Sequence, residues 1–201
     1  MYIPAAFHEQ DLPTLRAVIR ANPFALLVSQ LDDVPFATHM PMLLETRGET
    51  DVLIGHVARA NAHVRAFDGE TDSMAVFSGP HAYVSPRWMT APAVPTWNYV
   101  AVHCYGQARR VDDPARVRAT LAALTDTYEN GQWSVDDLDP AYVERMMNGL
   151  VAFEMPIDLW RGKVKMSQNK PEGDQARIAR ALREDGEDGA ADWMAPRRPN
   201  P

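Results

Sequence analysis

The sequence has one cysteine, Cys104, among its 201 residues, and it has no long apolar run. A single cysteine cannot form a disulfide within the chain, so a fold held together by internal disulfides is excluded. No window approaches the roughly 18 consecutive apolar residues of a membrane span, and the first residues lack the basic start and apolar stretch of a secretory signal. We therefore expect a cytoplasmic protein with no membrane partner.

Positive charge is also scarce. The chain has 20 lysines and arginines against 27 acidic residues, which gives a net charge of −7. Domains that bind nucleic acid by electrostatic attraction usually carry a basic excess. Arg177, Arg180 and Arg183 recur every third residue near the C-terminus, but such a pattern is more often a solvated helix face. Direct DNA binding is therefore doubtful.

Motifs of several common enzyme classes are missing. The chain has no glycine-rich phosphate loop of either nucleotide-binding type and no serine nucleophile elbow. Its six histidines show neither a zinc-site spacing with cysteines nor a helical His-Glu-x-x-His pair. We expect no metal site and can name no catalytic residue, so the sequence leaves open whether the protein is an enzyme.

The overall composition is that of a globular protein. Hydrophobic residues make up 46% of the chain and charged residues 23%, which is enough to bury a core. No internal repeat or linker divides the sequence. We expect one domain over residues 1–185, followed by a tail over 186–201 that is acidic, then proline-rich and poorly ordered, except where Trp193 and Met194 dock.

Alternating apolar patterns and turn signals predict about six or seven strands. They cover 24–30, 34–44, 52–57, 74–77, 81–84, 94–106 and 151–159. Capping residues and apolar stripes predict helices after Asp11, Asp113, Asp139 and Asn169. Because the early strands follow one another without helices, a parallel doubly wound sheet is disfavoured. We predict a mainly β protein, a barrel or strongly bent sheet with flanking N-terminal, mid-chain and C-terminal helices.

The stretch from Val94 to Gly106 combines a strong strand pattern with many aromatic and polar side chains. Alternation places Asn98, Val100, Val102 and Cys104 on one face, and Trp97, Tyr99, Ala101, His103 and Tyr105 on the other. The second face suits stacking on a planar ligand. It equally suits packing against a helix or a dimer partner, and the pattern alone does not decide between these.

Two polar clusters are candidate anion sites. Arg59 lies beside Asn61 at the end of an expected strand. Lys163, Lys165 and Ser167 share a face if their segment is extended, and Gln168 and Asn169 follow near an expected helix start, where an anion is stabilised. A solvated basic turn before a helix explains the second cluster as well.

Six blocks of sequence, in order along the chain, together resemble one family. They are Met1-Tyr2-Ile3-Pro4 with Phe7, Thr38-His39-Met40-Pro41, the block from Gly55 to Asn61, the block from Gly79 to Pro86, the block from Val94 to Tyr99 with His103 and Gly106, and Lys165-Met166-Ser167-Gln168-Asn169. They resemble the PaiB family, whose members are described as FMN-binding negative transcriptional regulators. The resemblance runs from residue 1 to about residue 185.

The resemblance implies a split β-barrel of the flavin-reductase and pyridoxamine-phosphate-oxidase type. It also implies a homodimer with FMN held at the subunit interface, and it places Arg59 where such barrels contact the FMN phosphate, a contact for which a guanidinium is well suited. From these blocks we expect cofactor contacts from His39, His56, Arg59, Asn61, Ser85, Trp97, Tyr99, His103, Lys165, Ser167 and Gln168.

The chain departs from the family pattern at two positions. Ala6 stands where the opening block usually has histidine, and Lys170 stands where arginine usually follows Ser-Gln-Asn. Lysine keeps the charge of arginine but lacks its planar fork. The functional alternatives are an FMN-dependent oxidoreductase of the flavin-reductase or pyridoxamine-phosphate-oxidase type, and a haem-handling split barrel in which a histidine ligates iron.

Overall fold

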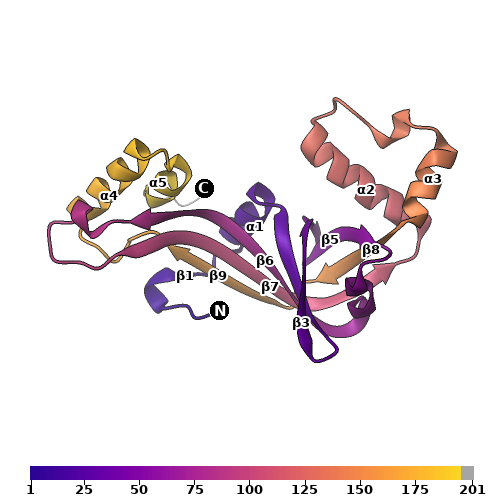
Figure 1. Ribbon diagram of the computed structural model, residues 1–201, viewed down its shortest axis with the longest axis horizontal. Helices are drawn as coiled ribbons and strands as arrows, with labels where there is room; N and C mark the ends of the chain where they lie inside the picture. Colours follow the sequence, from indigo (N-terminus) through magenta and orange to yellow (C-terminus); the bar gives the residue numbers. More distant parts are fainter. Residues whose placement is uncertain (196–201) are drawn as a thin grey trace. The chain divides into compact units, whose positions relative to one another are not determined.

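The computed structural model describes residues 1–195, which form two compact units (Figure 1). Unit 1 comprises Met1–Val18, Ser78–Val102 and the described residues from Arg161 onward, and unit 2 comprises Ile19–Phe77 and His103–Trp160. Two long strands, β6 (Asp68–Val84) and β7 (Thr96–Val111), run through both units. The described residues contain nine strands in one sheet and five α-helices, so the prediction of a mainly β protein with helices is confirmed.

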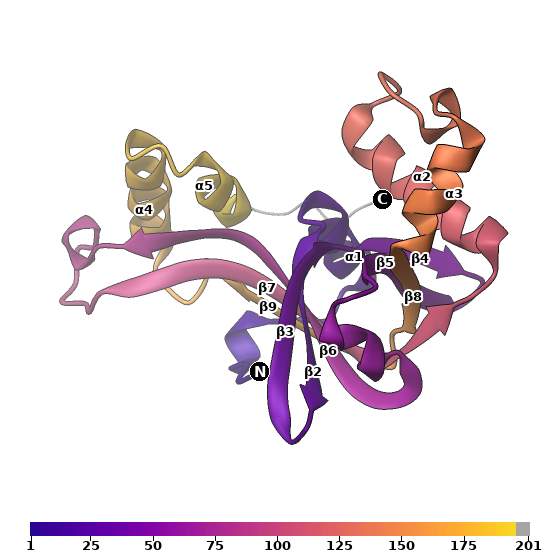
Figure 2. The ribbon, with the colours of Figure 1, turned by 45° about the vertical axis from the view of Figure 1, so that its right-hand side comes forward.

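Unit 2 holds most of the sheet, whose strand order is β3-β2-β6-β7-β8-β5-β4. The strands that lie wholly in this unit are β2 (Phe24–Leu31), β3 (Val34–Pro41), β4 (Leu43–Arg47), β5 (Thr50–Ala58) and β8 (Leu150–Pro156). β2 and β3 pair antiparallel as the predicted hairpin, visible in Figure 2. Its turn places Asp32 and Asp33 at φ 52° and 62°, a left-handed conformation that aspartate tolerates better than most residues.

The helices of unit 2 begin and end where the sequence predicted. α2 (Pro114–Glu129) begins after Asp113, whose carboxylate accepts the N–H of Ala115 at 3.1 Å. It ends at Asn130, which has φ 49° and closes the helix in the left-handed conformation that asparagine tolerates. α3 (Pro140–Asn148) begins after Asp139, which caps Tyr142 N–H at 2.9 Å. Short 3₁₀ helices cover Ala62–Ala66 and Val135–Asp137.

Unit 1 is built on the paired halves of β6 and β7 and on β9 (Leu159–Lys165), which pairs with β7 and with the short β1 (His8–Glu9). α1 (Leu12–Ala21) begins in this unit, where Asp11 accepts Thr14 N–H at 2.9 Å. α4 (Glu172–Glu184) and α5 (Asp188–Met194) pack on β6. Their buried contacts are made by Ala82, Val84, Ile178, Leu182, Ala190 and Ala191. The remaining 3₁₀ turns cover Ala5–Phe7 and Pro86–Trp88.

The expected tail therefore contains a packed helix. Ala190 and Ala191 on α5 are 2% and 1% exposed. Residues 196–201 lie outside the described residues. The domain boundaries at 185 and 186 stay a prediction.

β7 confirms the predicted alternation of faces. Asn98, Val100, Val102 and Cys104 are at most 2% exposed, whereas Trp97, Tyr99, Ala101, His103 and Tyr105 are partly or largely exposed. Burial raises the pKa of the Cys104 thiol, so this residue behaves as a small apolar side chain rather than a nucleophile.

Some predicted boundaries are wrong. The expected strand over 151–159 is two strands, because Pro156 has no N–H to continue the ladder. Ile157 N–H still donates to Asp51 O on β5, the neighbour of β8, whereas Asp158 N–H donates to Tyr105 O on β7, both at 2.9 Å. The strand over 34–44 likewise breaks at Met42, whose N–H donates to Pro23 O at 2.8 Å.

The predicted helix cap at Asn169 is also wrong. α4 starts at Glu172 after Pro171, with no side-chain cap. Ser167 has φ 60°, so the chain leaves the extended conformation after Lys165, and Ser167 does not continue the face of Lys163 and Lys165. No helix among residues 1–195 is long and apolar enough to cross a membrane.

A buried hydrogen-bond network lies inside unit 2 around His63, which is 0% exposed. Its Nε2 and Ser29 Oγ are 2.9 Å apart, its Nδ1 and Thr38 Oγ1 are also 2.9 Å apart, and Ser29 Oγ lies 2.6 Å from Ser73 Oγ. Asn61 Oδ1 accepts the N–H of His63 at 2.9 Å. The neutral imidazole thus has a partner for each nitrogen, and burial lowers its pKa to about 4.

This network predicts a loss of stability in mild acid. The folded-state pKa of His63, about 4, lies below its ordinary value of 6.5, so the stabilisation is complete above pH 6.5 and is lost as the pH falls toward 4. We expect the free energy of unfolding, measured by urea titration, to drop by about 2 to 3 kcal/mol across this range. His63→Asn should flatten the drop, whereas the exposed-site control His81→Gln should keep it. An unchanged drop in His63→Asn contradicts the assignment.

Candidate functional site

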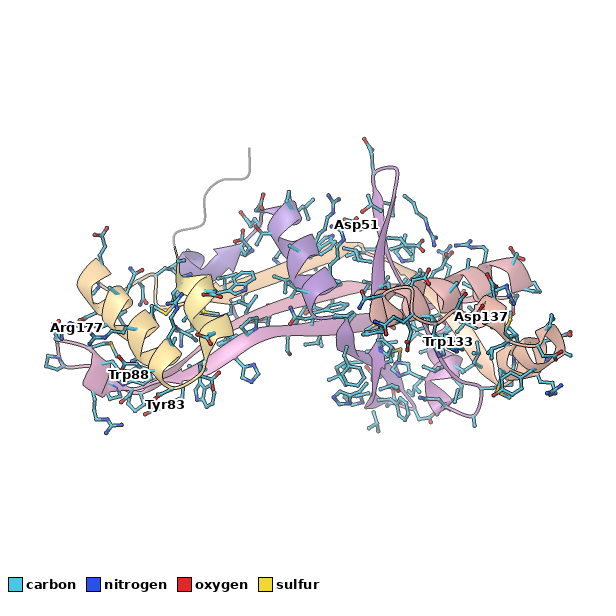
Figure 3. All side chains as sticks on the ribbon, turned by 90° about the horizontal axis from the view of Figure 1, so that it is seen from above. Asp51, Tyr83, Trp88, Trp133, Asp137 and Arg177 are labelled. Carbon is cyan, nitrogen blue, oxygen red and sulfur yellow. The ribbon has the colours of Figure 1, made fainter. Side chains whose placement is uncertain are left out.

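The exposed side of unit 1 carries an aromatic face formed by Tyr83, Trp97 and Tyr99. Tyr83 is 45% exposed and Trp97 54% exposed, and their rings meet edge to face with centroids 6.0 Å apart. In Figure 3, Tyr83 lies on the side of β6 away from α4 and α5. Lys163 Nζ lies 5.0 Å from the centroid of the Tyr99 ring, close enough for a cation–π interaction. The face therefore offers flat rings beside a positive charge.

Two of the sequence blocks meet behind this face. Lys165 Nζ donates to Thr96 Oγ1 and, at 2.7 Å, to the carbonyl of Trp97. Ser167 Oγ donates to Asn98 Oδ1 at 2.9 Å, and Asn98 is 0% exposed. The Trp-Asn-Tyr and Ser-Gln-Asn blocks, about 70 residues apart in sequence, therefore hold one another in place.

The lysines of this region favour an anion. Burial lowers the pKa of Lys165, and the neighbouring charges of Lys163 and Lys170 lower it further. Such mutual repulsion falls when a negative group binds between the ammonium groups. The predicted anion site at these lysines thus has an electrostatic basis in the folded chain.

Two other residues of unit 1 that were predicted to contact the cofactor form side-chain hydrogen bonds with the backbone instead. Gln168 Oε1 accepts Met166 N–H at 2.7 Å, and its Nε2 donates to Val164 O at 2.5 Å. Ser85 is 3% exposed, and its Oγ accepts Arg87 N–H at 3.3 Å. These groups shape the loops around the site, and their side-chain bonds are already used within the chain.

Arg59 lies in unit 2 directly after β5, and its side chain reaches the end of α3. Its Nε donates to Asn148 O at 2.6 Å and its Nη2 to Leu150 O at 3.0 Å, so part of the guanidinium caps that helix. Its other N–H groups have no partner among the described residues. Beside it is a cavity of about 210 Å³ that Arg110 also lines. Asp112 lines the same cavity, and its carboxylate pairs with Arg110 Nε at 2.6 Å, so the remaining N–H groups of Arg59 are the ones that suit a phosphate.

Two histidines of unit 2 carry buried nitrogens without partners. Nδ1 of His56 on β5 and Nδ1 of His103 on β7 are shielded from solvent and make no hydrogen bond among the described residues. Burial lowers the pKa of both side chains. A buried unpaired polar atom costs stability, and a bound ligand can supply the missing partner.

The remaining predicted residues of unit 2 are explained within the chain. His39 is exposed and stacks on Phe24 with ring centroids 6.2 Å apart. Asn61 Nδ2 donates to Thr38 Oγ1 at 3.3 Å and belongs to the His63 network. In residues 1–195 no group of histidine, cysteine and acidic side chains could hold a metal ion.

Two residues make contacts that the predicted site did not anticipate. Asn98 was placed on the apolar face of its strand, and its buried amide instead anchors Ser167. Lys163 was grouped with the anion cluster, and its contact with Tyr99 depends on the pairing of distant segments. An asparagine on an otherwise apolar strand face is the one signal in the sequence that marks the first of these.

Comparison with known proteins identifies relatives over most of the chain. Residues 1–159 match the model of the family described as "Putative FMN-binding domain". The Bacillus subtilis protein named "Protease synthase and sporulation protein PAI 2" is 31% identical over 187 residues, which are 90% of this chain and 89% of that protein.

Solved structures show the same fold. The flavocytochrome Anf3 from Azotobacter vinelandii superposes with a TM-score of 0.65 at 20% identity, covering 85% of this chain and 75% of that one. The FAD and heme binding protein from Mycobacterium smegmatis gives 0.64 at 19% identity, covering 79% and 73%. The fold is the flavin-binding split barrel expected from the sequence. With the family model and the Bacillus relative both matching most of its length, the chain belongs to the PaiB family of FMN-binding split-barrel proteins.

Proposed function

We propose that the protein acts as a homodimer that holds FMN with the residues described above, and that it serves in negative transcriptional regulation. The observation that carries the flavin part is the meeting of the aromatic face with Lys163 and Lys165 in unit 1. Flat aromatic rings suit the isoalloxazine ring of FMN, and ammonium or guanidinium groups suit the FMN phosphate.

The donor set of the chain fits FMN. In unit 1 we assign ring contacts to Trp97 and Tyr99. In unit 2 we assign the phosphate to Arg59, and we assign hydrogen bonds to the buried nitrogens of His56 and His103. Bound FMN supplies reversible one-electron and two-electron chemistry. The protein residues bind and orient the cofactor and limit the access of water to it.

Exposed aromatic side chains support the dimer. A contiguous face with Tyr83 and Trp97 about half exposed is costly in water unless a partner or ligand covers it. The wild-type protein should therefore have the mass of a dimer in light scattering after size exclusion. Trp97→Glu should give the monomer mass and weaken FMN binding, because it places a negative charge in the proposed dimer interface.

A matched control separates this face from other exposed tryptophans. Trp133, between α2 and α3, is 41% exposed, and Trp133→Glu should keep the dimer. A monomeric wild-type protein, or a Trp97→Glu variant that stays dimeric, would count against the proposed interface.

Regulation without direct DNA contact is the form we favour. Arg180 pairs with Glu184 at 3.6 Å and Arg183 with Asp192 at 2.8 Å, so two of the three arginines on α4 already face carboxylates. The name of the Bacillus relative refers to protease synthesis and sporulation, which agrees with a regulatory role. A gel shift on the protein's own promoter region at low salt should show no retardation, while deletion of the gene should change transcript levels.

Absorption spectroscopy tests the cofactor first. Purified protein mixed with FMN and desalted should retain a flavin band, and excess FMN should raise the melting temperature. No retained flavin together with no thermal shift would refute FMN binding. If the protein is instead an oxidoreductase, the bound flavin is reduced rapidly by NADH or NADPH in stopped flow. A Soret band on addition of haem would favour haem handling.

A further inference from the structure

The C-terminal end of α2 carries two exposed aromatic rings that the flavin proposal does not use. Tyr128, in the last turn of α2, is 51% exposed, and Trp133, four residues beyond the end of the helix, is 41% exposed. Among residues 1–195, neither side chain has a hydrogen-bond or ring partner. Both residues belong to unit 2, whereas the aromatic face belongs to unit 1. Exposed tyrosine and tryptophan are typical of surfaces that bind a partner.

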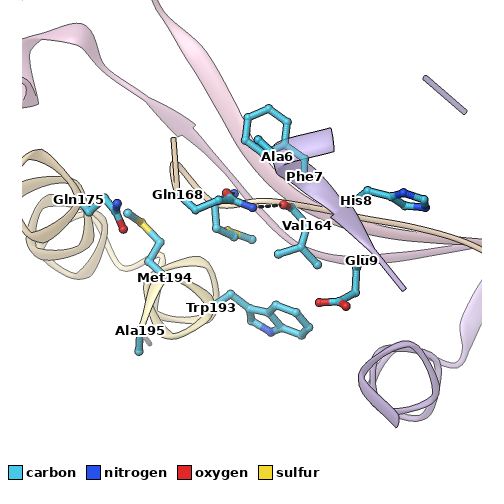
Figure 4. A pocket seen from close by; sticks show the side chains of 11 residues that line it. Ala6, Phe7, His8, Glu9, Val164, Gln168, Gln175, Trp193, Met194 and Ala195 are labelled. Atoms are coloured by element: carbon cyan, nitrogen blue, oxygen red, sulfur yellow. Dashed lines mark hydrogen bonds between the residues drawn. The ribbon is translucent and has the colours of Figure 1, made fainter. Parts of the chain in front are cut away.

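The same turn of α2 carries negative charge where a helix disfavours it. Asp126 and Glu129 lie in this last turn, which has no basic residue. The C-terminal end of a helix is its negative end, so carboxylates there destabilise the helix. Neither carboxylate has a partner among the described residues, unlike the amide of Gln168 in unit 1, which donates to Val164 O (Figure 4). Side chains that break a local rule without a compensating contact are expected at functional sites.

Negative charge continues along the chain from Ala119 to Glu144. This segment has six acidic residues and no lysine, arginine or histidine. Asp136 pairs with Arg118, which removes only part of the excess. Phosphate-bearing partners, such as nucleic acid or an anionic membrane, are repelled by such a surface, and a cationic partner is attracted.

The rings at the end of α2 specify the kind of cation. A guanidinium group stacks on an aromatic face and also pairs with a carboxylate through its planar fork. The chain already contains one such contact nearby, since the Arg145 guanidinium lies 5.6 Å from the centroid of the Tyr142 ring on α3. No group of side chains in residues 1–195 could hold a metal ion. The net charge of −7 also makes a second copy of this chain a poor electrostatic match.

We propose that the surface formed by Asp126, Tyr128, Glu129 and Trp133 docks an arginine-rich segment of another protein, with guanidinium groups over the two rings and beside the two carboxylates. The proposal is independent of FMN and of the regulatory role. It predicts binding that weakens with salt and that prefers arginine to lysine.

The experiment is a fluorescence anisotropy titration of the full chain against fluorescein-labelled octa-arginine and octalysine peptides at low salt. Octa-arginine should bind about 3-fold more tightly or better. The double variant Asp126→Asn/Glu129→Gln should weaken octa-arginine by about 5-fold, and Trp133→Leu should remove the preference for arginine. The double variant should melt at a temperature no lower than that of the wild type, because the end of α2 loses two unfavourable charges.

A matched control separates this surface from the net charge of the protein. Asp33→Asn/Glu49→Gln removes the same two charges from exposed turns of unit 2, and it should bind octa-arginine within about 2-fold of the wild type. Equal weakening by the two double variants, no binding of octa-arginine, or equal affinity for the two peptides would each overturn the proposal. A lower melting temperature of Asp126→Asn/Glu129→Gln would assign the carboxylates to the fold, and a changed mass in light scattering would assign the surface to a second copy.

Discussion

Replacement of Gly106 by alanine should remove most of the stability of the protein. A Cβ at this position would lie 2.0 Å from the carbonyl oxygen of Pro156 and 3.2 Å from its carbonyl carbon. These atoms belong to the backbone at the end of β8, so no side-chain rotation relieves the overlap, and two strands have to separate. We expect a loss of about 4 kcal/mol or more in the free energy of unfolding.

Urea unfolding followed by circular dichroism measures this loss, and Gly173→Ala is its control. Gly173 lies in the first turn of α4 with nothing within 4 Å of an added Cβ, and alanine is the better helix former. Gly173→Ala should therefore be neutral or slightly stabilising. A Gly106→Ala protein with an unfolding midpoint near that of the wild type would show that β7 and β8 do not approach as closely as the structure has them.

The fold was predictable wherever local chemistry decides it. Asp113 and Asn130 mark both ends of α2, and the period-two pattern of β7 identifies its buried face. The errors arise where hydrogen bonds to distant strands decide. The residues around Met42 do not predict the hydrogen bond from its N–H to the carbonyl of Pro23. The packing of α5 on β6 depends on an apolar surface of β6, which the tail sequence does not contain.

The candidate site was predictable as a set of residue types but not as a set of contacts. The blocks with Trp97 and Lys165 were recognised separately, and only the structure shows that the lysine donates to the tryptophan carbonyl. Gln168 has the chemistry of a ligand donor, yet both ends of its amide bind the backbone. A side chain's capacity to bind a cofactor is visible in the sequence, whereas its competing partners are not.

Arg59 can serve the protein in two ways, as a ligand of the FMN phosphate and as a cap of α3. We expect Arg59→Ala to weaken FMN binding by roughly 200-fold or more, about 3 kcal/mol. Part of the guanidinium caps α3 through Asn148 and Leu150. Its remaining N–H groups, beside Arg110 at the 210 Å³ cavity, are the ones we assign to the phosphate. Removal of the side chain therefore also lowers the melting temperature, because the carbonyls of Asn148 at the end of α3 and of Leu150 at the start of β8 each lose a donor.

Riboflavin, which is FMN without its phosphate, separates the two roles. If Arg59 binds the phosphate, fluorescence titration should show that Arg59→Ala loses affinity for FMN while its weaker affinity for riboflavin hardly changes. Arg59→Lys should fall between, since it keeps the charge and loses the fork. Arg65→Ala, which breaks the exposed ion pair with Asp32, should alter neither affinity. Equal losses for both flavins would assign Arg59 to the helix alone, and the phosphate would then belong to Lys165, where Lys165→Gln should produce the loss specific to FMN.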